Sequence, residues 1–201
     1  GIFVIYIFIK MINLILFGKP GSGKGTQAEF VKNKYDLIHI STGDVFRYNI
    51  SKKTDLGLLA KSYMEKGDLV PDNVTIKMLE AEVNKSPNAN GFIFDGFPRT
   101  TLQAEILDEF LLSNELSITM TIALEVDENI LIERLIKRGK DSGRVDDQDR
   151  SKIENRFDEY NKKTSILINY YKSQNKFFQI DGTGGISEIS ERIYNVIDSN
   201  I

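Results

Sequence analysis

The sequence predicts an α/β fold, a five-stranded parallel sheet with helices on both faces. Five short apolar runs alternate along the chain with longer stretches of helical character. The first run, residues 12–17, leads through a glycine-rich loop directly into a helix. Polar residues, among them Ser41, Asp95 and Asp181, follow the ends of other runs. Alternating strands and helices build a parallel sheet covered on both faces, and ligands bind beyond the carboxyl ends of its strands.

The glycine-rich loop, residues 18–26, reads Gly-Lys-Pro-Gly-Ser-Gly-Lys-Gly-Thr. A strand, a loop of this kind and a helix are typical of a phosphate-binding P-loop, so the fold is predicted to be of the P-loop NTPase type. Glycines let backbone N–H groups face phosphate oxygens, the helix N-terminus adds partial positive charge, and Lys24 supplies a full charge. Gly25 stands where a hydroxyl residue usually follows the lysine, and Thr26 comes one position later. The alternative is a glycine-rich turn that binds no ligand.

Composition narrows the classes of function. The chain has 201 residues, enough for one substantial core and a small insert, and a formal net charge of -3. A nucleic-acid binder is usually basic, so no nucleic-acid partner is expected. The sequence contains no cysteine, which excludes disulfides, cysteine-ligated zinc and thiol catalysis. This suits a reducing compartment, and we expect a cytoplasmic protein with no membrane partner.

The first ten residues form an apolar extension. Residues 2–9 are all hydrophobic and precede Lys10 and Met11. A helix needs about 20 apolar residues to span a bilayer, and no basic segment or small-residue cleavage site accompanies this run. We expect Met11 to be the natural start and residues 1–10 to be a non-native extension.

Capping residues, turns and apolar periodicity place the other elements. Ser41 or Thr42 can cap a helix with Asp44 in its first turn, and Asp127 can cap another. Residues 41–70 are predicted to form a small helical insert between two strands. Strands are expected at 12–17, 37–40, 91–95, 118–126 and 177–180, helices at 24–35, 56–66, 72–85, 100–112, 127–138, 149–172 and 186–198, and a polar loop at 139–147.

Three residues near the predicted strand ends have alternative interpretations. Asp95 ends a core strand, where P-loop enzymes place a carboxylate that binds the water ligands of a metal; the alternative is a turn residue. His39, the only histidine, is expected to be a core residue with a satisfied ring rather than a catalytic residue. Gln103 follows Thr100 by three positions, so it can belong to a capping box instead of a binding site.

Six arginines recur at or near loops on the same edge of the predicted sheet. A single surface arginine is usually just solvated, but several around one P-loop suit two clustered polyphosphates, because guanidinium binds phosphate in bidentate fashion. No side chain offers itself as a nucleophile. This fits phosphoryl transfer, in which positioning and charge neutralisation supply most of the catalysis. The six are Arg47, Arg99, Arg134, Arg138, Arg144 and Arg156.

From Met11 to its C-terminus the sequence resembles the adenylate kinase family, whose members interconvert ATP plus AMP and two ADP. Four motifs carry the resemblance in combination: the loop at 18–26, Ser-Thr-Gly-Asp-x-x-Arg at 41–47, Asp-Gly-Phe-Pro-Arg at 95–99 and Gly-Arg-Val-Asp-Asp at 143–147. The resemblance implies reversible phosphoryl transfer from ATP to AMP by a monomer, with Mg²⁺ as cofactor.

The resemblance also implies roles for individual residues. Lys24 would follow the transferred phosphoryl group, Asp95 would hold the waters of Mg²⁺, and Gln103 would read the adenine edge of AMP. The residues implied to be catalytic are Lys24, Arg99, Arg138, Arg144 and Arg156. Those implied to bind ATP are Gly21, Ser22, Gly23, Lys24, Gly25, Thr26, Arg134, Arg138 and Gly184. Those implied to bind AMP are Thr42, Arg47, Asp68, Leu69, Val70, Gly96, Phe97, Pro98, Arg99, Gln103, Arg144 and Arg156.

The implied organisation is a single kinase domain over residues 11–201. Its core would comprise 11–40, 71–137 and 148–201, with a mobile AMP-binding insert at 41–70 and a lid at 138–147. Closure of both would exclude the water that otherwise hydrolyses ATP.

The sequence departs from the family pattern in three places. Lys19 occupies a P-loop position that usually holds a small residue or proline. The lid is the short form, without a zinc-binding or β-hairpin insertion. The segment from Gln148 to Arg156 is one residue longer than in many members, which shifts Arg156 relative to the preceding motif.

Two alternatives stay open. A UMP/CMP kinase of the same superfamily resembles the chain across the fold but tends to carry alanine at the position of Thr42 and asparagine at that of Gln103, so these two residues favour AMP. A non-catalytic P-loop nucleotide-binding protein would need no acceptor pocket, and Arg47 and the Asp-Gly-Phe-Pro-Arg motif would then have no purpose.

Overall fold

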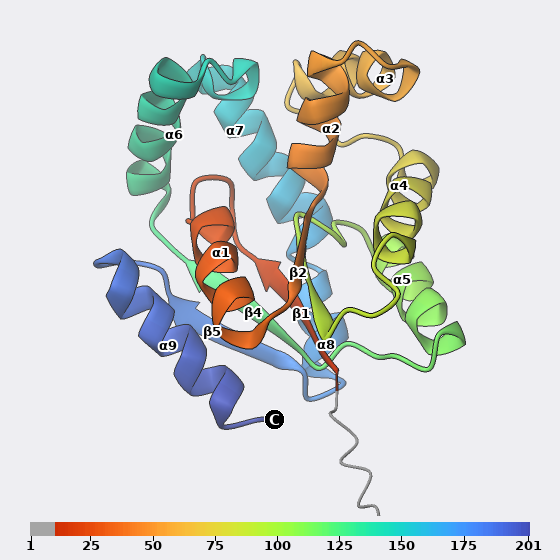
Figure 1. Ribbon diagram of the computed structural model, residues 1–201. Coiled ribbons are helices and arrows are strands. Elements are labelled where there is room, and N and C mark those ends of the chain that lie inside the picture. Colours follow the sequence, from red (N-terminus) through yellow and green to blue (C-terminus); the bar gives the residue numbers. More distant parts are fainter. Residues whose placement is uncertain (1–10) are drawn as a thin grey trace, which may run out of the picture.

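The computed structural model describes residues 11–201, and the prediction that residues 1–10 are a non-native extension lies outside the described residues. Figure 1 shows a central sheet with helices on both sides. Each pair of neighbouring strands is parallel, in the order β2-β3-β1-β4-β5. The predicted fold class is therefore confirmed. The strands are β1 (Ile12–Phe17), β2 (Ile38–Ser41), β3 (Gly91–Asp95), β4 (Met120–Glu125) and β5 (Phe177–Asp181).

Helices connect the strands and extend beyond them. No helix in residues 11–201 is both long and apolar enough to cross a membrane. Short 3-10 and π-helical turns, η1 (Val145–Asp147) and η2 (Tyr160–Thr164), flank α7. The helices are α1 (Lys24–Tyr35), α2 (Thr42–Ser51), α3 (Asp55–Met64), α4 (Asp72–Asn84), α5 (Thr101–Ser113), α6 (Glu128–Ser142), α7 (Arg150–Glu159), α8 (Leu167–Lys172) and α9 (Ile186–Asp198).

The central strand β1 shows why the sheet is buried on both faces. Leu14 and Leu16 point to the face covered by α1 and α9. Ile15 and Phe17 point to the opposite face, where they pack with apolar residues of α4, α5 and α8. All four side chains are buried. A continuous apolar strand in this position is what a parallel sheet between two helical layers requires.

Two helical arms extend beyond the carboxyl edge of the sheet, at the end where the loop before α1 lies (Figure 1). One arm, α2 and α3, has a small core of its own around Phe46 and Ala60. The other arm, α6 and α7, is joined by contacts that include Leu135 and Phe157. Each arm therefore has its own apolar contacts, and the loop before α1 lies between their bases.

Several predicted caps are confirmed. The Ser41 hydroxyl accepts the Asp44 backbone N–H at the start of α2, and Asp127 accepts from the N–H of Asn129 at the start of α6. Helix α4 has no side-chain cap, since Pro71 is at the capping position and Asp72 is the first helical residue. The carboxylate of Asp72 forms hydrogen bonds with another helix instead.

The structure corrects the polar loop predicted at 139–147. Helix α6 continues to Ser142, so the first half of that segment is helical. Gly139 does not stop the helix because it lies against the backbone of η1; a Cβ there would come within 2.6 Å of the Asp147 carbonyl oxygen. The helix ends instead at Gly143, whose φ of 66° is left-handed.

The structure also interrupts the long helix predicted at 149–172. At η2 the chain forms a wider turn, in which the Ser165 N–H donates to the Tyr160 carbonyl. Thr164 lies in this turn and donates its hydroxyl to the Arg99 carbonyl at 3.0 Å. Single π-helical turns of this kind are frequent at functional sites. This turn anchors the segment that follows β3.

Candidate active site

The loop between β1 and α1 lies at the middle of the sheet edge because β1 is the central strand. Gly18 has a φ of 143°, and a Cβ there would lie 2.6 Å from Ser22 Oγ. Gly23 caps α1 with a φ of 96°, and nothing lies within 4 Å of where its Cβ would stand. The N-terminus of α1 therefore opens into free space with its N–H groups available, which suits a bound anion.

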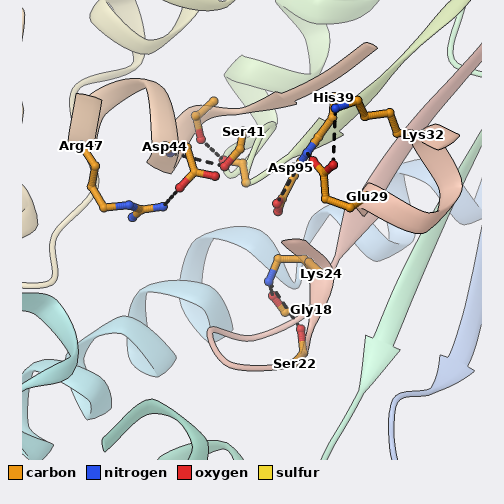
Figure 2. Close-up of polar contacts among 12 residues, drawn as sticks. Gly18, Ser22, Lys24, Glu29, Lys32, His39, Ser41, Asp44, Arg47 and Asp95 are labelled. Carbon is orange, nitrogen blue, oxygen red and sulfur yellow. Dashed lines mark hydrogen bonds and ion pairs between the residues drawn. The ribbon is translucent and has the colours of Figure 1, made fainter. Parts of the chain in front are cut away.

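Lys24 is held by the loop itself. Its Nζ donates to the Gly18 carbonyl at 2.6 Å and to the Lys19 carbonyl at 3.2 Å, and it lies 3.5 Å from Ser22 Oγ (Figure 2). Burial lowers the pKa of Lys24 to about 8, the charge of Asp95 opposes this shift, and Arg99 adds to it. The ammonium is therefore a positive group confined among other positive groups, a position that negative phosphates would relieve.

A cleft of about 750 Å³ lies above this loop, between the two arms. It is lined by residues 20–26 of the P-loop, the end of β3 and side chains from both arms. The predicted site residues that line it are Gly21, Ser22, Gly23, Lys24, Gly25, Thr26, Arg47, Asp95, Gly96, Arg99, Arg134, Arg138, Arg144, Arg156 and Gly184.

Two smaller hollows adjoin the cleft and share Arg99 with it. One lies against α2 and the start of α5, and the other lies beside η2. The first is lined by predicted residues Thr42, Asp68, Leu69, Val70, Gly96, Arg99 and Gln103, and the second by Lys24, Leu69, Gly96, Phe97, Pro98, Arg99 and Arg156. The structure thus brings every predicted site residue to one of three neighbouring surfaces.

Arg138 and Arg156 share one buried carboxylate. Arg138 Nε and Nη2 lie 2.6 and 3.0 Å from the two oxygens of Asp147, and Arg156 Nη1 lies 2.6 Å from Asp147 Oδ1. Arg156 Nη1 also lies 3.1 Å from Asp146 Oδ2. Burial by itself would raise the pKa of Asp147, but the hydrogen bonds from Arg138 and the charge of Arg156 outweigh it and lower that pKa. Asp147 therefore stays ionised and fixes two guanidinium groups at the edge of the cleft.

A second carboxylate joins the two arms. Asp44 in α2 pairs with Arg47 on the same helix, and its Oδ1 lies 3.5 Å from Arg144 Nη2 next to η1. Burial would raise the pKa of Asp44, but the hydrogen bond from Arg47 outweighs burial, so the pKa lies below its ordinary value. This contact connects two positively charged side chains from opposite sides of the cleft.

Arg99 is fixed by the loop that follows β3. Its Nε donates to the Gly96 carbonyl at 2.7 Å, and the same carbonyl accepts the Thr42 hydroxyl at 2.9 Å. Burial, with the charge of Arg156 as the second cause, lowers the pKa of Arg99 to about 10. The guanidinium stays charged near neutral pH, and an anion between Arg99 and Arg156 would offset their repulsion.

Figure 2 shows His39 between two carboxylates. Its Nε2 lies 3.3 Å from Asp95 Oδ2, and its Nδ1 lies 3.1 Å from Glu29 Oε1. Burial disfavours the charged ring, but the hydrogen bond and charge of Asp95 outweigh it and raise the pKa of His39. The prediction of a ring with satisfied nitrogens is confirmed, although His39 lies in the wall of the cleft rather than in the core.

The surroundings of Asp95 fit a magnesium ion that is held mainly by nucleotide phosphates. Desolvation would raise the pKa of Asp95, but the hydrogen bond with His39 and the charge of Lys24 keep it low, so the carboxylate is ionised. Gly25 leaves space beside it, since a Cβ there would lie 3.7 Å from Asp95 Oδ2. Within residues 11–201 no three acidic, histidine or cysteine side chains group into a metal site. Mg²⁺ typically binds in this way, to one or two carboxylates, waters and substrate phosphates.

Lys19, the unusual P-loop residue, points away from Lys24. Its Nζ lies 2.5 Å from Glu128 Oε1 in the first turn of α6. Only its carbonyl contacts Lys24. The positive charge of Lys19 is thus paired with the base of the α6 arm and is not added to the P-loop cavity.

Sequence reasoning missed the acidic residues that hold the cationic ones. Asp146 and Asp147 were identified only as parts of a motif, Asp44 only as a motif residue in the first turn of a helix, and Glu29 was not identified. A positively charged site must be held together by carboxylates at its edges, so Gly-Arg-Val-Asp-Asp could have indicated two such residues. The pairing of Asp147 with Arg138 joins α6 to η1, which only the three-dimensional structure shows.

Comparison with known proteins agrees with this geometry. The family model described as adenylate kinase matches residues 16–176. The chain is 61% identical over 189 residues to an adenylate kinase from Flavobacterium psychrophilum, with 94% of this chain and 100% of the relative covered. It is 58% identical to an adenylate kinase from Flavobacterium johnsoniae, again with 94% of this chain and 100% of the relative covered. It is 45% identical to an adenylate kinase from Bacteroides thetaiotaomicron, with 94% of this chain and 99% of the relative covered. With its P-loop, its cationic cleft and matches that run nearly the full length of its relatives, the chain belongs to the adenylate kinase family.

Proposed function

We propose that this protein catalyses reversible phosphoryl transfer from ATP to AMP, giving two ADP. The observation that carries the proposal is the arrangement of Lys24, Arg99, Arg138 and Arg156 around one cleft at the N-terminus of α1. Two polyphosphates that meet in one site need this much positive charge, and the site needs no nucleophile of its own. The acceptor phosphate is itself the nucleophile.

In the donor half of the proposed site, the P-loop and α1 bind ATP. The backbone N–H groups after Gly21 and at the start of α1 cradle the phosphates, and Lys24 exchanges its carbonyl contacts for phosphate oxygens. Arg134, which lies 3.5 Å from the Gly21 carbonyl, and Gly184 lie beside the nucleoside, and Arg138 neutralises the phosphates. Ser22, Gly23, Gly25 and Thr26 complete this half.

In the acceptor half, Arg47, Arg99 and Arg156 bind the phosphate of AMP. The adenine occupies the hollow formed by Thr42, Asp68, Leu69, Val70 and Gln103. Gly96, Phe97 and Pro98 continue this AMP site toward Arg99.

Charge neutralisation and alignment drive the transfer. An oxygen of the AMP phosphate attacks the γ-phosphorus of ATP in line. The bond from that phosphorus to the oxygen bridging the β- and γ-phosphates breaks, so both the donor and the acceptor become ADP. Lys24, Arg138, Arg144 and Arg156 are placed to balance the charge that spreads over the transferred group. Mg²⁺ near Asp95 would supply Lewis acidity toward the donor phosphates.

The two arms serve as covers for the reaction. Residues 41–70 form the AMP-binding insert and residues 138–147 the lid, and the contact of Asp44 with Arg144 is the meeting point of the two. Covering the cleft excludes water, which otherwise accepts the phosphoryl group. We further propose that the protein acts as a cytoplasmic monomer.

The proposed reaction is tested by comparing acceptors. ADP formation is measured with ATP, Mg²⁺ and equal concentrations of AMP, UMP, CMP or GMP. Thr42 and Gln103 predict strong turnover with AMP alone. Preference for UMP or CMP would overturn the acceptor assignment while the mechanism stands, and ADP formation that does not depend on an acceptor would exclude a kinase.

A further inference from the structure

The side-chain amide of Gln103 is held at both ends. Gln103 is 2% exposed and lies in the first turn of α5. Its Oε1 accepts the backbone N–H of Arg99 at 2.8 Å, and its Nε2 donates to Asp72 Oδ1 at 2.6 Å. The predicted capping interaction is present in part, because the Thr100 hydroxyl accepts the Gln103 N–H, but the amide reaches back to Arg99.

The chemistry of these two partners fixes which way the amide points. A backbone N–H can only donate, and an ionised carboxylate can only accept. If the amide of Gln103 were reversed, its NH₂ would face the Arg99 N–H and its oxygen would face the Asp72 carboxylate. Both contacts would then be repulsive, so a single orientation is stable.

Asp72 is in turn held rigidly. Its Oδ2 accepts the Thr100 hydroxyl at 3.1 Å, and the same hydroxyl accepts the Gln103 N–H at 3.2 Å. Asp72, Thr100 and Gln103 thus form a closed ring of hydrogen bonds between the first turns of α4 and α5. Among the described residues, Gln103 lines the hollow beside α2 and Asp72 does not, so Asp72 can act on a bound base only through Gln103.

We propose that Asp72 is a positioning residue that sets the base selectivity of the acceptor site by locking the amide of Gln103. A primary amide has two N–H groups and two acceptor lone pairs, and the contacts with Asp72 and Arg99 use one of each. One N–H and one lone pair remain for a base. Adenine presents an acceptor at N1 and a donor at its 6-amino group, whereas hypoxanthine presents N1–H as donor and O6 as acceptor. A locked amide matches the first pattern and opposes the second.

The inference rests on the proposed use of AMP as acceptor. It adds the expectation that the site discriminates against IMP, whose base is hypoxanthine, and a physical cause for that discrimination. It is tested with Asp72→Asn, which keeps the size of the side chain but can donate as well as accept. The measurement is kcat/KM for AMP and for IMP at saturating ATP. Glu109→Gln is the control, because Glu109 is an exposed carboxylate on the same helix as Gln103 and lies outside both arms.

We expect the ratio of kcat/KM for AMP to that for IMP to fall roughly tenfold in Asp72→Asn, the discrimination expected of about one hydrogen bond. The KM for ATP is expected to be unchanged, and Glu109→Gln is expected to keep the original ratio. A purely structural role of Asp72 would lower both kcat/KM values equally. An unchanged ratio in a folded variant would therefore overturn the inference, whereas an unaltered protein that does not use AMP would overturn the proposed function.

A second measurement needs no variant. The locked amide predicts that one of the two side-chain N–H protons of Gln103 exchanges slowly with solvent in NMR spectra of the nucleotide-free protein, because it donates to Asp72. This proton is expected to exchange with solvent at least tenfold more slowly than the side-chain amide protons of the exposed Gln148. Equal and fast exchange at the two residues would contradict the lock.

Discussion

The carboxylate of Asp147 lies 2.6 Å from Arg156 Nη1 and is fully buried. Because Arg138 also binds it, this single negative charge holds two arginines from different helices at the edge of the cleft. The same pattern recurs at Asp44, which contacts Arg47 and Arg144. The arginines that face the phosphates are thus prepositioned by acidic residues behind them, which reduces the cost of organising the site during reaction.

Asp147→Asn is therefore expected to destabilise the fold as well as the reaction. Removing one partner of a buried ion pair leaves charges unpaired, which costs about 3 kcal/mol of unfolding free energy. Urea unfolding and kcat are measured together. Glu154→Gln is the control, since it breaks an exposed pair with Arg150 and should change neither quantity much. If the two variants are equally stable, Asp147 does not hold the arginines as described.

Lys24 should take up a proton when ATP binds. In the nucleotide-free protein its pKa is about 8, so at pH 8 about half of the molecules carry the charge. Triphosphate raises that pKa, so binding draws protons from the buffer. For the same reason, kcat/KM for ATP should fall as the pH rises through about 8, where the free enzyme loses the charge.

Proton uptake is measured by titration calorimetry of ATP in two buffers that differ in ionisation enthalpy. Lys24→Arg is the matched control because guanidinium stays charged and has no proton to gain. The original protein is expected to take up more protons at pH 8 than Lys24→Arg does. Identical uptake in both proteins would show that Lys24 is already fully charged before ATP binds.

Arg99→Ala should impair AMP use selectively. Charge-assisted hydrogen bonds to phosphate contribute about 1.5–3 kcal/mol, so the KM for AMP is expected to rise roughly 10- to 100-fold. ATP affinity, measured by calorimetry without AMP, is expected to stay within about threefold of its original value, because the P-loop is untouched. Equal losses of both affinities would contradict the assignment of Arg99 to the acceptor phosphate.

Asp95→Asn should raise the Mg²⁺ concentration needed for half-maximal activity by about 10- to 100-fold, the usual effect of weakening the ligands around a metal. Binding of ATP in the presence of Mg²⁺ gives the second readout. Glu29→Gln is the comparison, since Glu29 contacts the other nitrogen of His39. A loss of the same size in Glu29→Gln would attribute the effect to the His39 contacts rather than to the metal.

The fold could be predicted from the sequence because its signals are local. β1 matches its predicted bounds of 12–17, and α9 matches 186–198, since an apolar run and a capped amphipathic helix define their own ends. The end of α6 could not be predicted, because Gly139 serves a tertiary contact with η1 and not a stop. The π-helical turn at Tyr160–Thr164 could not be predicted either, because it too makes a tertiary contact, from Thr164 to the Arg99 carbonyl.

The candidate site also contains residues that a local pattern predicts and residues whose role depends on tertiary packing. Lys24 and Gly23 lie in a contiguous motif whose residue types and spacing indicate phosphate binding, so their location was predictable. Asp72 and the Arg99 backbone together position the amide of Gln103. Asp72 lies 31 residues from Gln103 along the chain and belongs to another helix. Such a pairing depends on how α4 and α5 pack, and no local pattern in one sequence encodes it.

The most direct measurement starts from ADP as the only nucleotide. The protein is incubated with ADP and Mg²⁺, and the products are separated by chromatography. Reversible transfer between two bound nucleotides predicts ATP and AMP in equal amounts, with no inorganic phosphate released, and Lys24→Met should form neither. Release of phosphate, or no conversion of ADP at all, would contradict phosphoryl transfer between two adenine nucleotides in this cleft.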